Sequence, residues 1–164
     1  MTGYFHATPR PPHAGDAERV RALVFSVLGV TPYVDRVVEL LASAEHGDPD
    51  SRALIIERDG TVAALALFGP IAGTANSWRL ASAIVAPQVD VADVGHVIVD
   101  AVASRAREEG GRLLVAELAD DVALGRSLAM LRANGFQEEG RVRDFYRAGV
   151  ALIFMRRDLQ APLT

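Results

Sequence analysis

The first part of the chain carries two stretches in which apolar residues recur every three or four positions. From Asp16 to Gly29 this pattern predicts a helix with an aspartate cap at its start and a glycine stop. From Thr31 to Leu41 a second apolar stripe predicts another helix, with a threonine cap and a proline in its first turn. Residues 3–8 are predicted to form a short strand before both helices.

The middle of the chain is rich in strand-forming residues. The stretch "ALIIERDGTVAALALFG" has two apolar runs around an Asp-Gly dipeptide, which suits a tight hairpin because both positions tolerate positive φ. A third antiparallel strand is predicted over residues 77–87 and a buried strand over residues 112–118. A helix that starts near Val94 and ends at Gly110 joins these two, so they should be parallel neighbours.

The last third predicts a helix over residues 121–134, with Gly135 as its C-cap, and a final hairpin around Ala148 and Gly149. This order of elements indicates one α/β domain over residues 1–164. We expect a mixed, mostly antiparallel sheet of roughly seven strands, with a parallel central pair and helices on both faces.

Composition excludes several classes of protein. Half of the 164 residues are hydrophobic, which suffices for one full core. The formal charge is −4 and all 17 basic residues are arginine, so no nucleic-acid partner is expected. The chain has no cysteine, which excludes disulfides and thiolate chemistry. It shows no signal pattern and no apolar run of membrane-spanning length, so we expect a cytoplasmic protein without membrane contact.

The stretch "QVDVADVGH", from Gln88 to His96, lies between a predicted strand and a predicted helix. Such a junction often binds phosphate, because free N–H groups and the helix dipole point outward there. Here, however, the stretch contains Asp90, Asp93 and a single glycine. Three interpretations are open: Asp93 caps the following helix itself, the loop folds differently and still admits a phosphate, or a metal bridges the two aspartates.

Two longer stretches resemble the GCN5-related N-acetyltransferase (GNAT) superfamily. They are "AIVAPQVDVADVGHVIVDAVASRAREEGGRLLVAEL" and "LRANGFQEEGRVRDFYRAGVALIFMRRDL", and the resemblance extends over about residues 16–159. It implies the GNAT fold, in which the parallel central strands splay apart and acetyl-CoA lies between them. The implied activity is transfer of an acyl group from acyl-CoA to an amine.

The resemblance also implies cofactor contacts. The positions that match them are the strand residues Ile84 and Val85 and the loop residues Val94, Gly95 and His96. The family's loop pattern, R/Q-x-x-G-x-G/A, falls on Asp90 to Gly95, so that aspartates replace the first polar residue and the first glycine. Because two negative charges near a pyrophosphate are repulsive, we expect acetyl-CoA to bind weakly.

Other positions bear on catalysis. The resemblance places Leu124 and Leu131 where relatives have a cofactor-binding asparagine and a proton-donating tyrosine, and leucine can do neither. Glu117 is the candidate general base on the strand beside the acceptor. Tyr146, with Asp144, matches a segment that lines the acceptor pocket. Alternatively, Glu117 is a solvated or ion-paired carboxylate and Tyr146 is a packed aromatic residue.

The leading hypothesis is therefore a GNAT-like N-acyltransferase with a small-molecule or peptide amine as acceptor. One alternative is a noncatalytic GNAT-fold domain that binds or scaffolds a partner, such as a second copy or an active paralogue. Another is a GNAT cavity used for a different ligand or reaction. His6, His13 and His46 show no metal-ligand spacing, and no metal site is expected.

Overall fold

The computed structural model describes residues 8–160, so nearly all of the strand predicted at 3–8 lies outside the described residues. The elements in chain order are a 3₁₀ turn η1 (Ala14–Asp16), α1 (Ala17–Leu28), α2 (Tyr33–Glu45), β1 (Arg52–Arg58), β2 (Thr61–Pro70), β3 (Ser77–Val85), the turn η2 (Val91–Gly95), α3 (His96–Glu108), β4 (Leu113–Ala119), η3 (Val122–Leu124), α4 (Gly125–Ala133), β5 (Gln137–Arg147) and β6 (Val150–Asp158).

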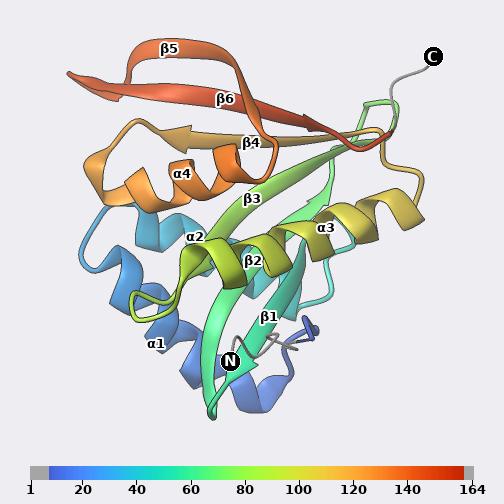
Figure 1. The fold of residues 1–164 in the computed structure, drawn as a ribbon, viewed down its shortest axis with the longest axis vertical. Coiled ribbons are helices and arrows are strands. Elements are labelled where there is room, and N and C mark those ends of the chain that lie inside the picture. The colour runs from blue at the N-terminus through green and yellow to red at the C-terminus, as the bar shows by residue number, and fades with distance from the viewer. Residues whose placement is uncertain (1–7, 161–164) are drawn as a thin grey trace, which may run out of the picture.

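The strands form one mixed sheet in the order β1-β2-β3-β4-β6-β5 (Figure 1). Only β3 and β4 are parallel among these neighbours, and all other pairs are antiparallel. The predicted fold class is confirmed, although residues 8–160 contain six strands rather than seven. Arg10 adds a single bridge to Ile55 of β1.

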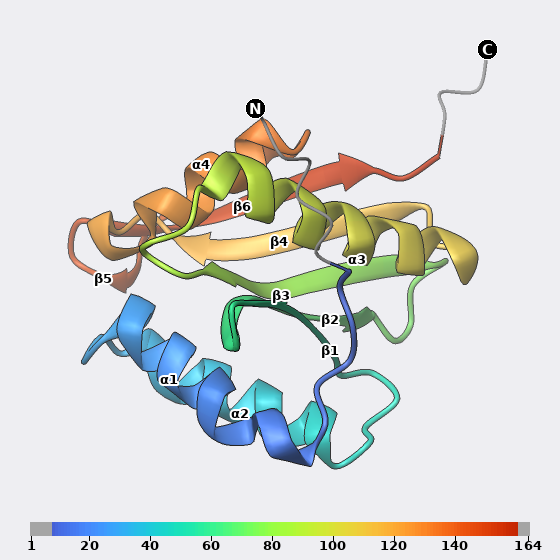
Figure 2. The same cartoon turned by 60° about the horizontal axis from the view of Figure 1, so that its bottom comes forward.

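Helices cover both faces of the sheet (Figure 2). Helices α1 and α2 pack on one face, while α3 and α4 lie on the other. The buried apolar residues of both layers and of the strands form one cluster. Its fully buried members include Val20, Leu41, Ile55, Ile98, Leu114 and Ile153. Among residues 8–160, no helix is long and apolar enough to cross a membrane.

The central strands β3 and β4 separate soon after they meet. Their parallel pairing joins Ser77–Arg79 to Leu113–Val115 and extends no further. On its other side, β3 stays paired with β2, with one extra residue, Ala81, at a register shift. The predicted splay is therefore confirmed, and it leaves the second half of β3 with β2 as its only strand neighbour.

Two predicted helix caps are wrong. The carboxylate of Asp16 is buried and makes no cap bond to α1, but accepts the N–H of His13 at 2.9 Å and pairs with Arg10 and Arg19. The hydroxyl of Thr31 is buried without a hydrogen-bond partner in the described part of the chain, and α2 begins after it at Tyr33. At Asp16 the cause is competition, since the carboxylate is taken by Arg10 and Arg19. At Thr31 no competing partner is found among residues 8–160, and the helix simply starts one residue later than the motif predicts.

Candidate functional site

A cavity of about 390 Å³ lies where β3 and β4 separate. Its walls come from four parts of the fold: α2 at Tyr33, β4 at Glu117, α4 at Leu131 and β5 at Tyr146, with the separated half of β3 between them. The lining is mainly apolar side chains with a few polar groups, which is the usual composition of a small-molecule site.

The main chain of β3 forms one wall of this cavity. Ile84 lines it, and its side chain is buried. Since β4 leaves β3 after Arg79, the main-chain groups on that side of β3 face the splay rather than a neighbouring strand. Val85 lies farther along, beside a smaller cavity of about 230 Å³ that also reaches Pro87.

The loop after β3 begins its helix with a π-helical turn, η2. Asp90 is the N-cap of this turn, and its carboxylate accepts the N–H of Ala92 at 2.8 Å. Asp93 lies inside the turn, is exposed and makes no cap bond. The prediction that Asp93 caps the helix is thus wrong by one turn, because the helical hydrogen bonding starts three residues earlier than the apolar stripe suggests.

The remaining glycine of the loop is explained by packing. A Cβ atom on Gly95 would lie 2.6 Å from Sδ of Met130 on α4, closer than carbon and sulfur can approach. The neighbouring Val94 is completely buried. Both residues therefore position η2 against α4, whatever else their main-chain groups bind.

His96 begins α3 and links it to the end of α4. Its Nδ1 lies 2.7 Å from Oδ1 of Asn134, and Nδ2 of Asn134 donates to the carbonyl of Met130. The ring of His96 is exposed on its other side. This bond holds the start of α3 against the end of α4 beside the loop.

An arginine from α4 reaches the same loop. The guanidinium of Arg126 donates to the carbonyl oxygens of Pro87 at 3.2 Å and Val89 at 3.3 Å. Arg126 also lines the smaller cavity. Sequence reasoning missed this residue, because nothing in the loop itself indicates that an arginine from a helix some 37 residues later binds its carbonyl oxygens.

One face of α4 and its preceding turn looks into the splay. Leu124, Ser127 and Leu131, spaced three and four residues apart, all line the larger cavity. The hydroxyl of Ser127 donates to the carbonyl of Ala83 on β3 at 3.4 Å. Ser127 was also missed, although a hydroxyl between two leucines on one helical face was a usable signal.

Glu117 lies on β4 between the buried residues Ala116 and Leu118 and faces the cavity. Its side chain makes no hydrogen bond or ion pair with any residue from 8 to 160. The alternative of an ion-paired carboxylate therefore has no support within the described chain, whereas the alternative of a solvated carboxylate stays open because Glu117 is exposed. An unpaired carboxylate beside a cavity can accept a proton from a bound ligand.

Tyr146 extends from β5 over the same space and is 44% exposed. Its ring meets Tyr33 edge-on at a centroid distance of 6.3 Å and Phe145 at 5.0 Å. Partial burial, followed by the negative charge of Glu117, raises the pKa of the Tyr146 hydroxyl above its ordinary value. The hydroxyl thus stays protonated near Glu117, and the two predicted catalytic residues lie at one cavity.

A charged network borders this end of the cavity. The hydroxyl of Tyr33 donates to Asp121 at 2.8 Å, and the Arg147 guanidinium donates to the same carboxylate at 2.6 Å. The N–H of Ala123, then Arg147 and Tyr33, lower the pKa of Asp121 to about 2. Asp121 is therefore fully ionised at neutral pH and fixes the rings beside it.

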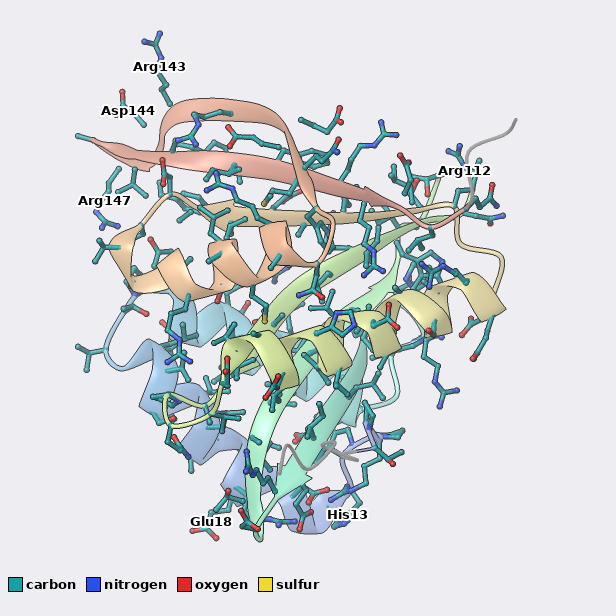
Figure 3. The ribbon with its side chains drawn as sticks, viewed as in Figure 1. His13, Glu18, Arg112, Arg143, Asp144 and Arg147 are labelled. Carbon is teal, nitrogen blue, oxygen red and sulfur yellow. The ribbon has the colours of Figure 1, made fainter. Side chains whose placement is uncertain are left out.

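Asp144 has a structural role at the hairpin. It adopts a φ of 53° in a bulge of β5, and its carboxylate accepts the N–H of Gly149 at 2.7 Å. Figure 3 shows the neighbouring Arg143 projecting away from the fold at this bulge. Of the predicted pair, Tyr146 faces the cavity, whereas Asp144 supports the hairpin that carries it.

Within residues 8–160, no group of three or more His, Cys, Asp or Glu side chains is placed to hold a metal ion. At the loop, Asp90 is instead occupied by its cap bond to Ala92. His13 lies beside Asp16 at the far end of α1, and Figure 3 shows it distant from Arg147 at the cavity's rim.

No protein-family model matches the chain, and no curated protein matches it. Solved structures do. A protein from Desulfovibrio desulfuricans, assigned to the acetyltransferases of the GNAT family, is 27% identical with a TM-score of 0.83, covering 94% of this chain and 99% of that one. The ribosomal-protein-alanine N-acetyltransferase of Brucella melitensis is 21% identical with a TM-score of 0.69, covering 92% and 98%.

A third neighbour was solved with its cofactor acetyl-CoA. It is a protein of Salmonella typhimurium assigned as an acetyltransferase, 18% identical with a TM-score of 0.70, covering 98% of both chains. The resemblance predicted from the sequence is thereby confirmed. The chain has the fold of the GNAT N-acetyltransferases.

Proposed function

We propose that this chain is an acyl-CoA-dependent N-acyltransferase, built as one domain. The observation that carries the proposal is the splay cavity, which has free main-chain groups on one side and the unpaired carboxylate of Glu117 on the other. An acyl transfer to an amine needs these two features, a wall that aligns an extended thioester and a base that faces it.

The separated half of β3 suits the pantetheine arm of acetyl-CoA. That arm carries amide groups that can pair with the main chain at Ile84 and Val85 as a neighbouring strand would. Acetyl-CoA, when bound, supplies an activated acyl group. The protein's part is to align it and to keep water away, and the apolar lining at the buried Leu131 and the half-buried Leu124 serves that purpose.

Three side chains would handle protons. Glu117 accepts a proton from the attacking amine, either directly or through water. The protonated hydroxyl of Tyr146, beside Glu117, donates a hydrogen bond on the acceptor side. Ser127 brings a hydroxyl to the α4 side, which has leucine where relatives offer a tyrosine, and it can donate a hydrogen bond to a leaving thiolate.

The pyrophosphate side is the weak part of the site. Asp90 gives its carboxylate to the helix start, so a negative charge stands where relatives have a basic or amide residue. Arg126 is the nearby cation, and two of its five N–H donors already bind loop carbonyls. We therefore expect acetyl-CoA to bind, but more weakly than it does to a glycine-rich loop.

The experiment that tests this function has two measurements. Calorimetric titration with acetyl-CoA should show binding, and thiol release in the presence of a panel of primary amines should show transfer. Ligand at one hundred times its dissociation constant should also stabilise the fold by about 2.7 kcal/mol. A micromolar dissociation constant would refute the prediction that the loop weakens acetyl-CoA binding. Absence of binding at millimolar acetyl-CoA would refute the acyltransferase function itself.

The second candidate is a noncatalytic GNAT-fold domain. Leu124, Leu131 and Asp90 favour it, because each replaces a group that relatives use on the cofactor. It predicts that neither acetyl-CoA nor CoA changes the melting temperature. If the folded protein shows that outcome, the noncatalytic domain becomes the better-supported function.

A further inference from the structure

A second cavity, of about 370 Å³, adjoins the first on the side of the sheet that α2 covers. The two cavities share Arg36 of α2 and Ala81 of β3. They therefore meet at the point where the splay begins. A ligand that reaches past these two residues would occupy parts of both cavities.

Arg79 of β3 lines this second cavity. Its side chain makes no hydrogen bond, ion pair or ring contact with any residue from 8 to 160. Arg21 and Arg143 share this property among the described arginines, but neither lines either of these two cavities. Arg79 thus holds an uncompensated positive charge at a concave surface.

The other charges around this cavity leave it positive. Within residues 8–160, Arg36 pairs only with Glu39, at 3.4 Å, and both side chains are more than two-thirds exposed. Arg52 is neutralised by Glu109 and stacks on Trp78 at 4.9 Å. Asp50 is the acidic residue among those that line the cavity. Two weakly engaged guanidinium groups therefore face one carboxylate.

The register of the sheet relates Arg79 to Glu117. Arg79 is paired with Val115, and Glu117 lies two residues farther along β4, so its side chain points to the same face of the sheet. The spacing of strands and residues separates the two Cα atoms by roughly 8 Å before the splay widens. Both side chains are long enough to approach one small molecule.

We propose that the second cavity binds the anionic group of the amine acceptor, with Arg79 as its main ligand and Arg36 beside it. The acceptor is then an amine that carries a carboxylate a few bonds from its nitrogen, as an amino acid does. A guanidinium binds a carboxylate through two parallel hydrogen bonds, which fixes the orientation of the amine toward Glu117. This inference rests on the proposed function and names its substrate class.

The test compares acceptors that differ only in the carboxylate. A panel of L-amino acids is set against the amines that lack only their carboxylate, with acetyl-CoA as donor and thiol release as the readout. The wild type should prefer the amino acids. Arg79→Met should lower kcat/KM for the preferred amino acid by about ten- to hundredfold and leave its carboxylate-free counterpart unchanged.

Arg143→Met is the matched control, because Arg143 is also unpaired within the described chain but projects away from the fold (Figure 3). It should change neither rate. A wild type that prefers the carboxylate-free amines, or an Arg79→Met protein that loses activity equally on both, overturns the inference while the proposed function stands.

A binding measurement separates the inference from the proposed function. If no amine is acetylated, the proposed function fails, and calorimetric titration of the amino acids into the free protein decides the matter. Binding that Arg79→Met abolishes and Arg143→Met retains supports the anion site. Absence of binding by the wild type to the whole panel overturns it.

Discussion

The two sides of the splay are built on different principles. On the side of α4 and η2, three polar side chains are bonded within the chain: Asp90 by Ala92, His96 by Asn134 and Arg126 by two loop carbonyls. On the side of α2 and β5, the rim network around Asp121 is likewise bonded within the chain. The side chains of Glu117 and Arg79, however, face cavities there without partners among residues 8–160.

This difference separates groups that hold the fold from groups that are available to a ligand. A polar group that already has a partner stabilises its surroundings, and a ligand must displace that partner to use it. An unpaired charge at a solvated concave surface costs little free energy. It contributes most to binding when a ligand of opposite charge pairs with it. In the proposed acyltransferase, the acceptor side would therefore depend on side chains and the cofactor side on main chain.

The largest expected effect concerns Glu117. Glu117→Gln removes the carboxylate that we propose as the base while keeping the shape of the side chain, and we expect kcat to fall by about 10²- to 10⁴-fold. Steady-state thiol release at several pH values measures it. Glu18→Gln, at an exposed acid on α1 far from the cavity (Figure 3), is the control and should leave kcat unchanged. Equal rates for Glu117→Gln and the wild type would show that another group takes the proton.

Next in size is the charge of Asp90. Asp90→Asn keeps an oxygen that accepts the N–H of Ala92 but removes the negative charge beside the pyrophosphate position. At about 5 Å and an effective dielectric constant near 20, that charge opposes binding by roughly 3 kcal/mol, about a hundredfold. Because Asp90 is exposed, we expect acetyl-CoA to bind about ten- to hundredfold more tightly, as measured by calorimetry. An unchanged dissociation constant would place the pyrophosphate elsewhere.

A substitution at Gly95 tests whether the packing of η2 against α4 stabilises the fold. Gly95→Ala places a methyl group against Met130, and we expect a loss of about 1–3 kcal/mol in the free energy of unfolding. Gly125→Ala, where a Cβ meets nothing within 4 Å, is the control and should be neutral or stabilising. Urea denaturation compares them, and equal stability of the two variants would contradict the packing role.

The smallest effect separates the two aspartates of the loop. Asp90→Ala should cost about 1 kcal/mol of stability because it removes the cap, while Asp93→Ala should change stability by less than about 0.5 kcal/mol. The same denaturation experiment measures both. A larger loss at Asp93 would restore it as the cap.

Much of the fold could be predicted because its signals are local. Asp59 and Gly60 carry positive φ as a tight turn requires, and Gly135 ends α4 in the left-handed region. The parallel pair followed from a helix that connects two strands. Where local signals compete with distant partners, prediction failed, as it did at Asp16, which binds Arg10 rather than the end of a helix.

The candidate site was predictable only in part. Glu117 and Tyr146 were found because the resemblance supplies their positions, and the structure brings them to one cavity. Arg126 and Ser127 act across the sheet, on groups about 40 residues away in sequence. Arg79 could not be recognised either, since the absence of a partner for one arginine among many is a property of the folded chain alone.

Because β3 and β4 separate after Arg79, the sheet has an unpaired strand edge in its interior as well as at its two ends. Exposed edges invite other chains to pair with them, and proteins usually cover them. This one is recessed among Tyr33, Leu131 and Tyr146, so a single extended molecule fits where a second sheet cannot. If the proposed acyltransferase binds its cofactor along this edge, short linear amides with a narrow backbone should compete with it for the same main-chain groups.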